Sequence, residues 1–223
     1  MNAEIDVISF LKENFNYHMR IIVSNKNQII GKLVPIRYAD IGDESLLDLL
    51  TQWRNDNIDA YPSQFNATTE RTRKWLVKYI LENETKILFL LLNNHDQPIG
   101  HMGFASYNNQ LKTIEMDNIV RGIKNKHKGI ITNALYDLIS WTFLTFPINS
   151  VYLRVFSDNL RAIELYKRLN FIEIQKIPLM KTTEGKEIKY YEIESVHLAD
   201  RFFSKMELKR IQHFENYNIK YGE

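Results

Sequence analysis

The spacing of apolar residues along the chain predicts two amphipathic helices in its first half. One covers residues 43–53, after turn and cap residues at 40–43, and the other runs from residue 68 or 69 to about residue 81. Their apolar faces carry Leu46, Leu47, Leu49, Leu50 and Trp53 in the first helix, and Trp75, Leu76, Tyr79 and Ile80 in the second. A shorter helix is expected near residues 7–14.

Runs of β-branched, aliphatic and aromatic residues predict strands. They cover residues 20–23, 33–37, 87–92, 99–105, 113–120, 151–156, 171–174 and 202–208. Turn-forming residues at 93–98 are typical of an antiparallel connection, and residues 182–186 predict another turn between strands. Helices are expected after residue 130 and from residue 158 or 159 to Leu169, with Asn170 in the left-handed conformation that often ends a helix. The order of elements indicates an α/β or α+β domain, a mixed sheet with helices on its faces.

The composition supports a folded chain and excludes several kinds of site. Of the 223 residues, 44% are hydrophobic and 25% are charged, which is enough material for a packed interior. Its 29 basic and 27 acidic residues give a net charge of +2, so we expect no general attraction to nucleic acid or to a membrane. The chain has no cysteine, and its six histidines show no paired spacing for a metal, so we expect no metal site.

The N-terminal residues lack the basic and apolar regions of a secretory signal, and no apolar run approaches the length of a bilayer span. We therefore expect a soluble, cytoplasmic protein. One core is expected, and either a monomer or a homodimer is compatible with the sequence.

A basic loop joins the strand at 113–120 to the following helix. It reads Ile-Lys-Asn-Lys-His-Lys-Gly-Ile at residues 123–130, so three lysines and a histidine crowd the N-terminus of a helix. Positive charge there opposes the helix dipole, whereas a bound anion would complement both. Together with the glycine, this favours a pyrophosphate site, and the alternative is a solvated basic loop.

The segment after the next strand carries the most specific pattern. Asn159, Ala162, Tyr166, Leu169 and Phe171 fall at the positions of a motif that resembles the second signature of the GNAT acetyltransferase superfamily. That motif reads Asn-x-x-Ala-x-x-x-Tyr, then an aliphatic residue, Gly and Phe, and here Asn170 stands in the place of the glycine.

The basic loop resembles the coenzyme A loop of the same family, in which Arg or Gln is followed by Gly and then by Gly or Ala. Lys126 and Gly129 fit this pattern, whereas Ile131 occupies the last small position. The resemblance covers roughly residues 32–208. It implies an N-terminal extension at residues 1–31, a GNAT domain at 32–210 and a C-terminal tail at 211–223.

The resemblance implies a mostly antiparallel sheet, with a V-shaped splay between its fourth and fifth strands that admits the pantetheine arm of acetyl-CoA. A backbone N–H near Val120 would polarise the thioester carbonyl, and Asn159 would either bind pantetheine or cap its helix. The residues expected to hold the co-substrate are Ile119, Val120, Lys126, His127, Lys128, Gly129, Ile130, Ile131 and Asn159.

Catalytic roles follow from the resemblance and from strand geometry. Tyr166 matches the tyrosine that protonates the departing thiolate in the family, and the alternative is a tyrosine that packs on its helix face. Glu115 and Asp117 share one face of their strand because side chains alternate, and Asp117 is the favoured base. A chain of water molecules competes for this role, and His101 is a third candidate.

The acceptor is expected to be a primary amine, on a nucleotide-linked amino sugar in the first instance and on a protein N-terminus or another small amine in the second. Trp53-Arg54-Asn55 resembles a segment that borders the acceptor cleft in GNAT enzymes that act on amino sugars and ribosomal proteins. Arg54 would pair with an acceptor phosphate or lie on the surface. Residues 61–69 are expected to form a mobile rim.

Two hypotheses from other classes stay open at this point. A GNAT module that binds coenzyme A without turnover would share every motif described above, and a nucleotide-binding protein would share the basic loop. Measured turnover separates the first from an enzyme, and the relative affinity for ATP and coenzyme A separates the second.

Overall fold

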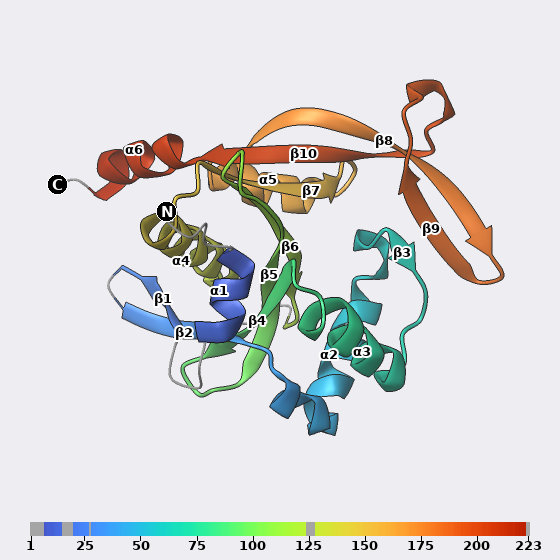
Figure 1. Ribbon diagram of the computed structural model, residues 1–223, viewed down its shortest axis with the longest axis horizontal. Coiled ribbons are helices and arrows are strands. Elements are labelled where there is room, and N and C mark those ends of the chain that lie inside the picture. The colour runs from blue at the N-terminus through green and yellow to red at the C-terminus, as the bar shows by residue number, and fades with distance from the viewer. Residues whose placement is uncertain (1–6, 15–19, 27, 124–127, 222–223) are drawn as a thin grey trace.

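The computed structural model describes residues 7–14, 20–26, 28–123 and 128–221, and their helices and strands are shown in Figure 1. The ten described strands form one sheet in the order β1-β2-β4-β5-β6-β7-β10-β8-β9-β3. The strands are β1 (Ile21–Asn25), β2 (Gln28–Pro35), β3 (Ser63–Gln64), β4 (Lys86–Asn93), β5 (Pro98–Asn108), β6 (Thr113–Arg121), β7 (Ser150–Phe156), β8 (Ile172–Glu184), β9 (Glu187–Glu192) and β10 (Arg201–Lys209). The α-helices are α1 (Val7–Asn14), α2 (Glu44–Asp56), α3 (Thr69–Trp75), α4 (Ile130–Thr145), α5 (Leu160–Arg168) and α6 (Arg210–Tyr221). Three 3₁₀ helices, η1 (Tyr38–Gly42), η2 (Ile58–Ala60) and η4 (Val196–Leu198), and one π-helix, η3 (Leu76–Leu81), complete the described helical segments.

Neighbouring strands run antiparallel throughout the described sheet except at the junction of β6 and β7. There Thr113–Glu115 lies parallel to Ser150–Tyr152, and beyond these three pairs the two strands separate. The expected splay between the fourth and fifth strands is therefore confirmed at β6 and β7, which are sixth and seventh in the chain because the short β3 and the N-terminal β1 are also present. The expected mixed, mostly antiparallel sheet is confirmed as well.

Both faces of the sheet are covered by helices. Ile87, Phe89 and Leu91 of β4 belong to the larger apolar cluster, which includes residues of α1, α4 and α5. Leu88 and Leu90 belong to a second cluster with α2 and η3. Because successive side chains of a strand point to opposite faces, the two clusters lie on opposite sides of β4. Burial on both faces explains why β4 is almost continuously apolar.

The terminal segments pack on this same framework. Val7 and Leu11 of α1 are fully buried in the larger cluster, and the boundary expected between residues 31 and 32 falls inside β2. At the other end, His213 of α6 is 3% exposed and its Nε2 lies 2.7 Å from Ser140 Oγ on α4. Residues before 32 and after 210 therefore contribute to the packed core.

The second half of the sheet extends into a long hairpin of β8 and β9, drawn at the right of Figure 1. Its turn contains Gly185, which adopts φ +58, a conformation that favours glycine. The strand expected at 171–174 continues to Glu184, so the predicted turn at 182–186 lies at the tip of the hairpin. No helix in the described part of the chain is both long enough and apolar enough to cross a bilayer.

Candidate active site

A cleft of about 730 Å³ opens where β6 and β7 separate. Its walls come from the second half of β6, the second half of β7, the start of α4, and α5. The far end of the cleft is lined by residues 57 and 60–62, by Tyr190 and Glu192 of β9, and by Phe203 of β10. The volume lies in the range of small-molecule sites.

One end of the cleft is suited to anions. Gly129, at φ +83, is the N-cap of α4 and has no side chain with which to cap the helix, so the first N–H groups of α4 lack an intrahelical acceptor and can bind a ligand. Lys128, Arg161 and Arg168 line the same cleft, and none of the three forms an ion pair with a carboxylate among the described residues. These donors and charges fit the phosphate groups of coenzyme A.

The residues expected to hold coenzyme A divide into three groups. Ile119, Val120, Lys128, Gly129, Ile131 and Asn159 line the cleft. Ile130 is 4% exposed and packs into the core, so its side chain takes no part in the lining. Lys126 and His127 lie outside the described residues.

Tyr166 of α5 lines the cleft and is 6% exposed. Burial raises its pKa, and the nearby negative charge of Asp117 raises the pKa further. The hydroxyl therefore keeps its proton at neutral pH and can donate it within the cleft. Asn159 lines the cleft too, and its Oδ1 accepts a hydrogen bond from the backbone N–H of Ala162 at 3.2 Å, so it caps α5.

A bulge interrupts β6 beside the cleft. His101 pairs with Val120 and Gly103 pairs with Asp117, so Asn118 and Ile119 together face one residue of β5. Asn118 has φ +53, which is an uncommon conformation for a residue other than glycine. The bulge redirects the backbone of Ile119 and Val120, both of which line the cleft.

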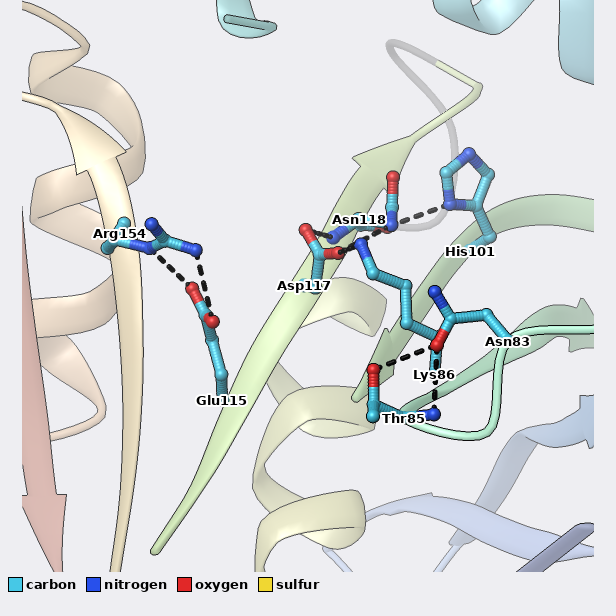
Figure 2. Close-up of polar contacts among 8 residues, drawn as sticks. All are labelled: Asn83, Thr85, Lys86, His101, Glu115, Asp117, Asn118 and Arg154. Atoms are coloured by element: carbon cyan, nitrogen blue, oxygen red, sulfur yellow. Dashed lines mark hydrogen bonds and ion pairs between the residues drawn. The ribbon is translucent and has the colours of Figure 1, made fainter. Parts of the chain in front are cut away.

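Glu115 and Asp117 both line the cleft, yet each carboxylate is already bound. Glu115 is 5% exposed and accepts hydrogen bonds from Arg154 Nε at 2.7 Å and Nη2 at 3.2 Å, as Figure 2 shows. Arg154 also pairs with Glu192 of β9. Asp117 accepts from Lys86 Nζ at 3.0 Å, from the Asn118 N–H at 2.8 Å and from Asn118 Nδ2 at 2.9 Å.

The cleft lining does not include Trp53, Arg54 or Asn55, whose contacts are with segments beside the cleft. Trp53 is 2% exposed and packs on Gly122, where a Cβ would come within 2.0 Å of the indole ring. Asn55 exchanges two hydrogen bonds with the backbone of Ala67, at 2.8 and 3.0 Å. These residues were expected to touch the acceptor, and the structure gives them an indirect position.

Arg54 lies between two aromatic rings of the rim. Its guanidinium carbon is 4.4 Å from the ring centre of Tyr61 and 4.1 Å from that of Phe65, and its Nη2 donates to the carbonyl of Ser63 at 2.6 Å. Arg71 lies on the Phe65 ring at 3.6 Å and pairs with Glu187 of β9. The Arg54 side chain is therefore neither a free surface arginine nor directed at the cleft.

His101 is likewise absent from the cleft lining. It is 3% exposed, and its Nδ1 lies 2.7 Å from the carbonyl oxygen of Asn118. Burial lowers its pKa to about 4, so it is neutral at physiological pH.

The far end of the cleft is lined by three aromatic residues and one acidic residue, and apart from Tyr61, which belongs to the expected rim, none of them was predicted from the sequence. They are Tyr61, Tyr190, Glu192 and Phe203. Residues 61–69 were expected as a mobile rim, but β3 pairs with β9 and Tyr190 N donates to Pro62 O at 2.8 Å. The alternation of Ile188, Tyr190 and Glu192 along one strand face is the signal that could have indicated a cleft wall.

Comparison with known proteins agrees with this geometry. The family model of the acetyltransferase (GNAT) domain matches residues 33–172. No curated protein gives a significant sequence match.

Several solved structures share the fold. A spermidine N-acetyltransferase from Vibrio cholerae, in complex with CoA and spermine, is 14% identical, with a TM-score of 0.61 over 82% of this chain and 96% of its own. FdhC, a nucleotide-linked sugar GNAT, is 16% identical, with a TM-score of 0.60 over 86% and 93%. RimL, a ribosomal L7/L12 α-N-protein acetyltransferase in complex with coenzyme A, is 14% identical, with a TM-score of 0.60 over 87% and 99%.

The matched family model spans more than half of the chain, and its range includes the splayed strands, the basic helix N-terminus and Tyr166. The chain therefore belongs to the GNAT acetyltransferase family, whose members transfer an acyl group from acyl-coenzyme A to an amine.

Proposed function

We propose that this protein acetylates a primary amine in the cleft between β6 and β7, and that the amine belongs to a nucleotide-linked amino sugar. The observation that carries the proposal is the chemical difference between the two ends of one cleft. The end at α4 and α5 presents cations and free N–H groups, and the end at β9 and the rim presents aromatic rings and carboxylates.

The cationic end would hold acetyl-CoA. Lys128, Arg161, Arg168 and the N–H groups that follow Gly129 would bind its phosphates, because charge-assisted hydrogen bonds to phosphate are strong and a helix N-terminus favours anions. Acetyl-CoA supplies a thioester carbonyl for attack and a thiolate that can leave.

In this proposal the backbone after the bulge and Tyr166 carry the chemistry. The amine nitrogen forms a bond with the carbonyl carbon, and the carbon–sulfur bond breaks. The backbone N–H of Ile119 or Val120 stabilises negative charge on the carbonyl oxygen, because both residues line the cleft directly after the bulge. Tyr166 gives its proton to the departing sulfur.

The amine must also lose a proton. Glu115 is occupied by Arg154, and Asp117 by Lys86 and Asn118, which weakens both as bases. We therefore assign deprotonation to water in the cleft, and we give Asp117 a role in positioning the strand. Of the candidate bases that the sequence left open, a chain of water molecules is therefore favoured over Asp117, Glu115 and His101.

The far end of the cleft favours a sugar. Tyr61, Tyr190 and Phe203 offer aromatic surfaces on which the apolar face of a sugar ring can pack. Glu192 and Arg154 offer acceptors and donors for its hydroxyl groups. The shared fold with a nucleotide-linked sugar GNAT is consistent with this acceptor class.

A polyamine is the second candidate, and the carboxylates support it. Glu115, Asp117 and Glu192 line the cleft, and the cations beside them, Lys86 and Arg154, are engaged in ion pairs. A phosphate group of the acceptor would therefore compete with these carboxylates for Lys86 and Arg154, whereas a second ammonium group would be attracted to the carboxylates.

The experiment is an assay of coenzyme A release from acetyl-CoA with a panel of acceptors. The panel contains UDP- and dTDP-linked amino sugars, free glucosamine, spermidine and peptides with a free N-terminus. We expect the highest kcat/KM with a nucleotide-linked amino sugar, and preference for spermidine would select the second candidate. Calorimetric titrations with coenzyme A and ATP complete the test: tight coenzyme A binding without turnover on any acceptor would contradict an enzymatic role, and tighter ATP binding would contradict the donor site.

A further inference from the structure

The bulge in β6 is held in place by two side chains from the adjoining strands β4 and β5, and both side chains lie outside the cleft lining. Lys86 comes from β4 and His101 from β5, and Figure 2 shows both beside Asp117 and Asn118 of β6. Neither has a role in the chemistry described above. His101 contacts Asn118 directly, and Lys86 is linked to Asn118 through Asp117.

Asn118 is held at three of its polar groups. Its backbone N–H donates to Asp117 Oδ1 at 2.8 Å, and its Nδ2 donates to Asp117 Oδ2 at 2.9 Å. Its carbonyl oxygen lies 2.7 Å from His101 Nδ1. Because a carbonyl oxygen only accepts, His101 carries its proton on Nδ1 and is the donor.

Lys86 completes the arrangement by binding the carboxylate that binds Asn118. Its Nζ donates to Asp117 Oδ2 at 3.0 Å, so the same oxygen receives both Lys86 and Asn118. The side chains of Lys86 and Asp117 are 32% and 35% exposed, which leaves the pair partly shielded from solvent. Lys86 therefore restricts the orientation of Asp117, and Asp117 restricts that of Asn118.

These contacts hold the backbone of Asn118 in an uncommon conformation. Its φ is +53, a region that few residues other than glycine adopt, although asparagine does so more often than most. His101 is buried with its ring 6.2 Å from the centre of the Trp53 ring, so its donor atom is fixed in place. Gly100 lets β5 approach β6 closely beside it, because a Cβ there would come within 2.4 Å of Val120 O.

From these contacts we infer that Lys86 and His101 are positioning residues for catalysis: through Asp117 and Asn118 they fix the direction of the backbone N–H groups after the bulge. The inference rests on the proposed function, in which one of those N–H groups, at Ile119 or Val120, polarises the thioester carbonyl. A donor that is fixed in place before the reaction stabilises developing charge far better than one that must reorganise.

The test measures polarisation of the carbonyl itself and needs no acceptor. Isotope-edited infrared spectra of bound [1-¹³C]acetyl-CoA report the carbonyl stretch, which shifts to lower frequency when the oxygen accepts a strong hydrogen bond. Calorimetry with coenzyme A reports the donor affinity separately. The variants are His101→Leu and His101→Asn, which have similar shapes but differ in the hydrogen-bond donor near the Nδ1 position, and Lys86→Met.

We expect the wild-type protein to shift the carbonyl stretch, and His101→Leu and Lys86→Met to move it back toward the value of free acetyl-CoA. His101→Asn should retain most of the shift. With any acceptor that is turned over, kcat should fall by about 100-fold in His101→Leu, as is typical when a reacting group is displaced by about 1 Å, while the KM for acetyl-CoA changes little. Two matched controls, His95→Gln and Lys78→Met, replace exposed side chains and should leave the spectrum unchanged.

Two results would decide against the inference. If the wild-type protein binds acetyl-CoA without a shift, the proposed polarisation fails and the positioning role fails with it. If the wild-type protein shows the shift and both Lys86→Met and His101→Leu keep it, the positioning role alone is wrong. If His101→Leu does not fold, Lys86→Met decides the question, because its partly exposed side chain can be replaced without opening the core.

Discussion

Glu115 and Arg154 form a two-pronged ion pair across the base of the cleft, beside the last residues at which β6 and β7 are still paired. The pair joins the two strands where their backbone ladder ends. Arg154 also forms an ion pair with Glu192, so the same guanidinium connects β9 to the wall of the cleft. The ion pair therefore sets the spacing of three strands and occupies a carboxylate that could otherwise act as a base.

Glu115→Gln should destabilise the fold. The glutamine keeps the shape of the side chain but loses its charge and one acceptor, which leaves Arg154 with a weaker partner. Because the Arg154 side chain is 39% exposed and keeps Glu192, we expect a loss of about 1–3 kcal/mol, below the usual figure for a fully buried pair. Urea unfolding measures the loss, and Glu164→Gln, in the exposed pair with Lys167, should stay close to wild type.

Tyr166→Phe tests the proton donor. The variant keeps the packing of the ring against Phe171 and removes only the hydroxyl, so we expect kcat to fall by about 100-fold, while the affinity for coenzyme A is unchanged. Turnover is followed by release of the free thiol. Tyr79→Phe, on an exposed side chain, is the control, and an unchanged rate in Tyr166→Phe would remove the acid role.

Arg54→Lys tests whether the rim depends on the stacked guanidinium. Lysine keeps the charge but cannot lie flat between Tyr61 and Phe65, so the rim should loosen and Tyr61 should lose its fixed position. We expect the KM for the acceptor to rise severalfold and the affinity for coenzyme A to stay constant. Hydrogen exchange of residues 57–67 should accelerate in the same variant.

The matched control for the rim is Arg20→Lys, on an exposed residue before β1. Equal exchange rates in Arg54→Lys and wild type would show that the hydrogen bonds of β3 and Asn55 are sufficient to hold the rim.

Gly122→Ala tests the packing of Trp53 beneath β6. A methyl group there would lie about 2.0 Å from the indole ring, which must then move, so we expect a loss of about 1–3 kcal/mol in the free energy of unfolding. Gly42→Ala is the control, because nothing lies within 4 Å of its Cβ position and its φ is not positive. Thermal unfolding of both variants checks the contrast, and equal melting temperatures would contradict it.

Stability should fall as the pH drops from about 6.5 to about 4. Burial lowers the pKa of His101 and of His213 to about 4, while in the unfolded chain both titrate near pH 6.5. Between these values the unfolded state binds more protons than the folded state, so acid favours unfolding. Urea unfolding across this range should show a shallower slope for His101→Asn than for wild type.

Much of the fold could be predicted from the sequence because its helices and strands have strong local patterns. Leu46 to Trp53 repeat at helical spacing, and Asn159 to Phe171 form a motif whose position fixes α5 and the start of β8. The β8–β9 hairpin was less visible, because most of its side chains are exposed or half-buried and leave a weak apolar pattern. The core role of α1 was missed because a short amphipathic helix does not indicate what it packs against.

The donor half of the site was predictable, and the acceptor half was not. Lys128, Gly129 and Tyr166 lie in or beside continuous motifs, so local sequence places them together. Tyr61 and Tyr190 line the same cleft because β3 and β9 pair at two residues, and these strands are more than 120 residues apart in the chain, so no local pattern indicates the arrangement. The positions of Arg54 and His101 depend on side-chain packing around them, and the sequence alone could not separate a supporting role from direct contact.

The three-residue parallel ladder between β6 and β7 also bears on how the chain folds. On one side of it, β1 with β2, β4 with β5 and β5 with β6 are pairs of strands that follow each other directly in the chain, whereas β2 pairs with β4 across the intervening α2 and α3. Most of the pairs in this half-sheet are therefore local and can form early. On the other side, β7 pairs with β10 and β3 pairs with β9, and in both cases the partner strand comes much later in the chain. The cleft needs pairings between segments far apart in the chain, so we expect the half-sheet of β1, β2, β4, β5 and β6 to form before the wall that would select the amine.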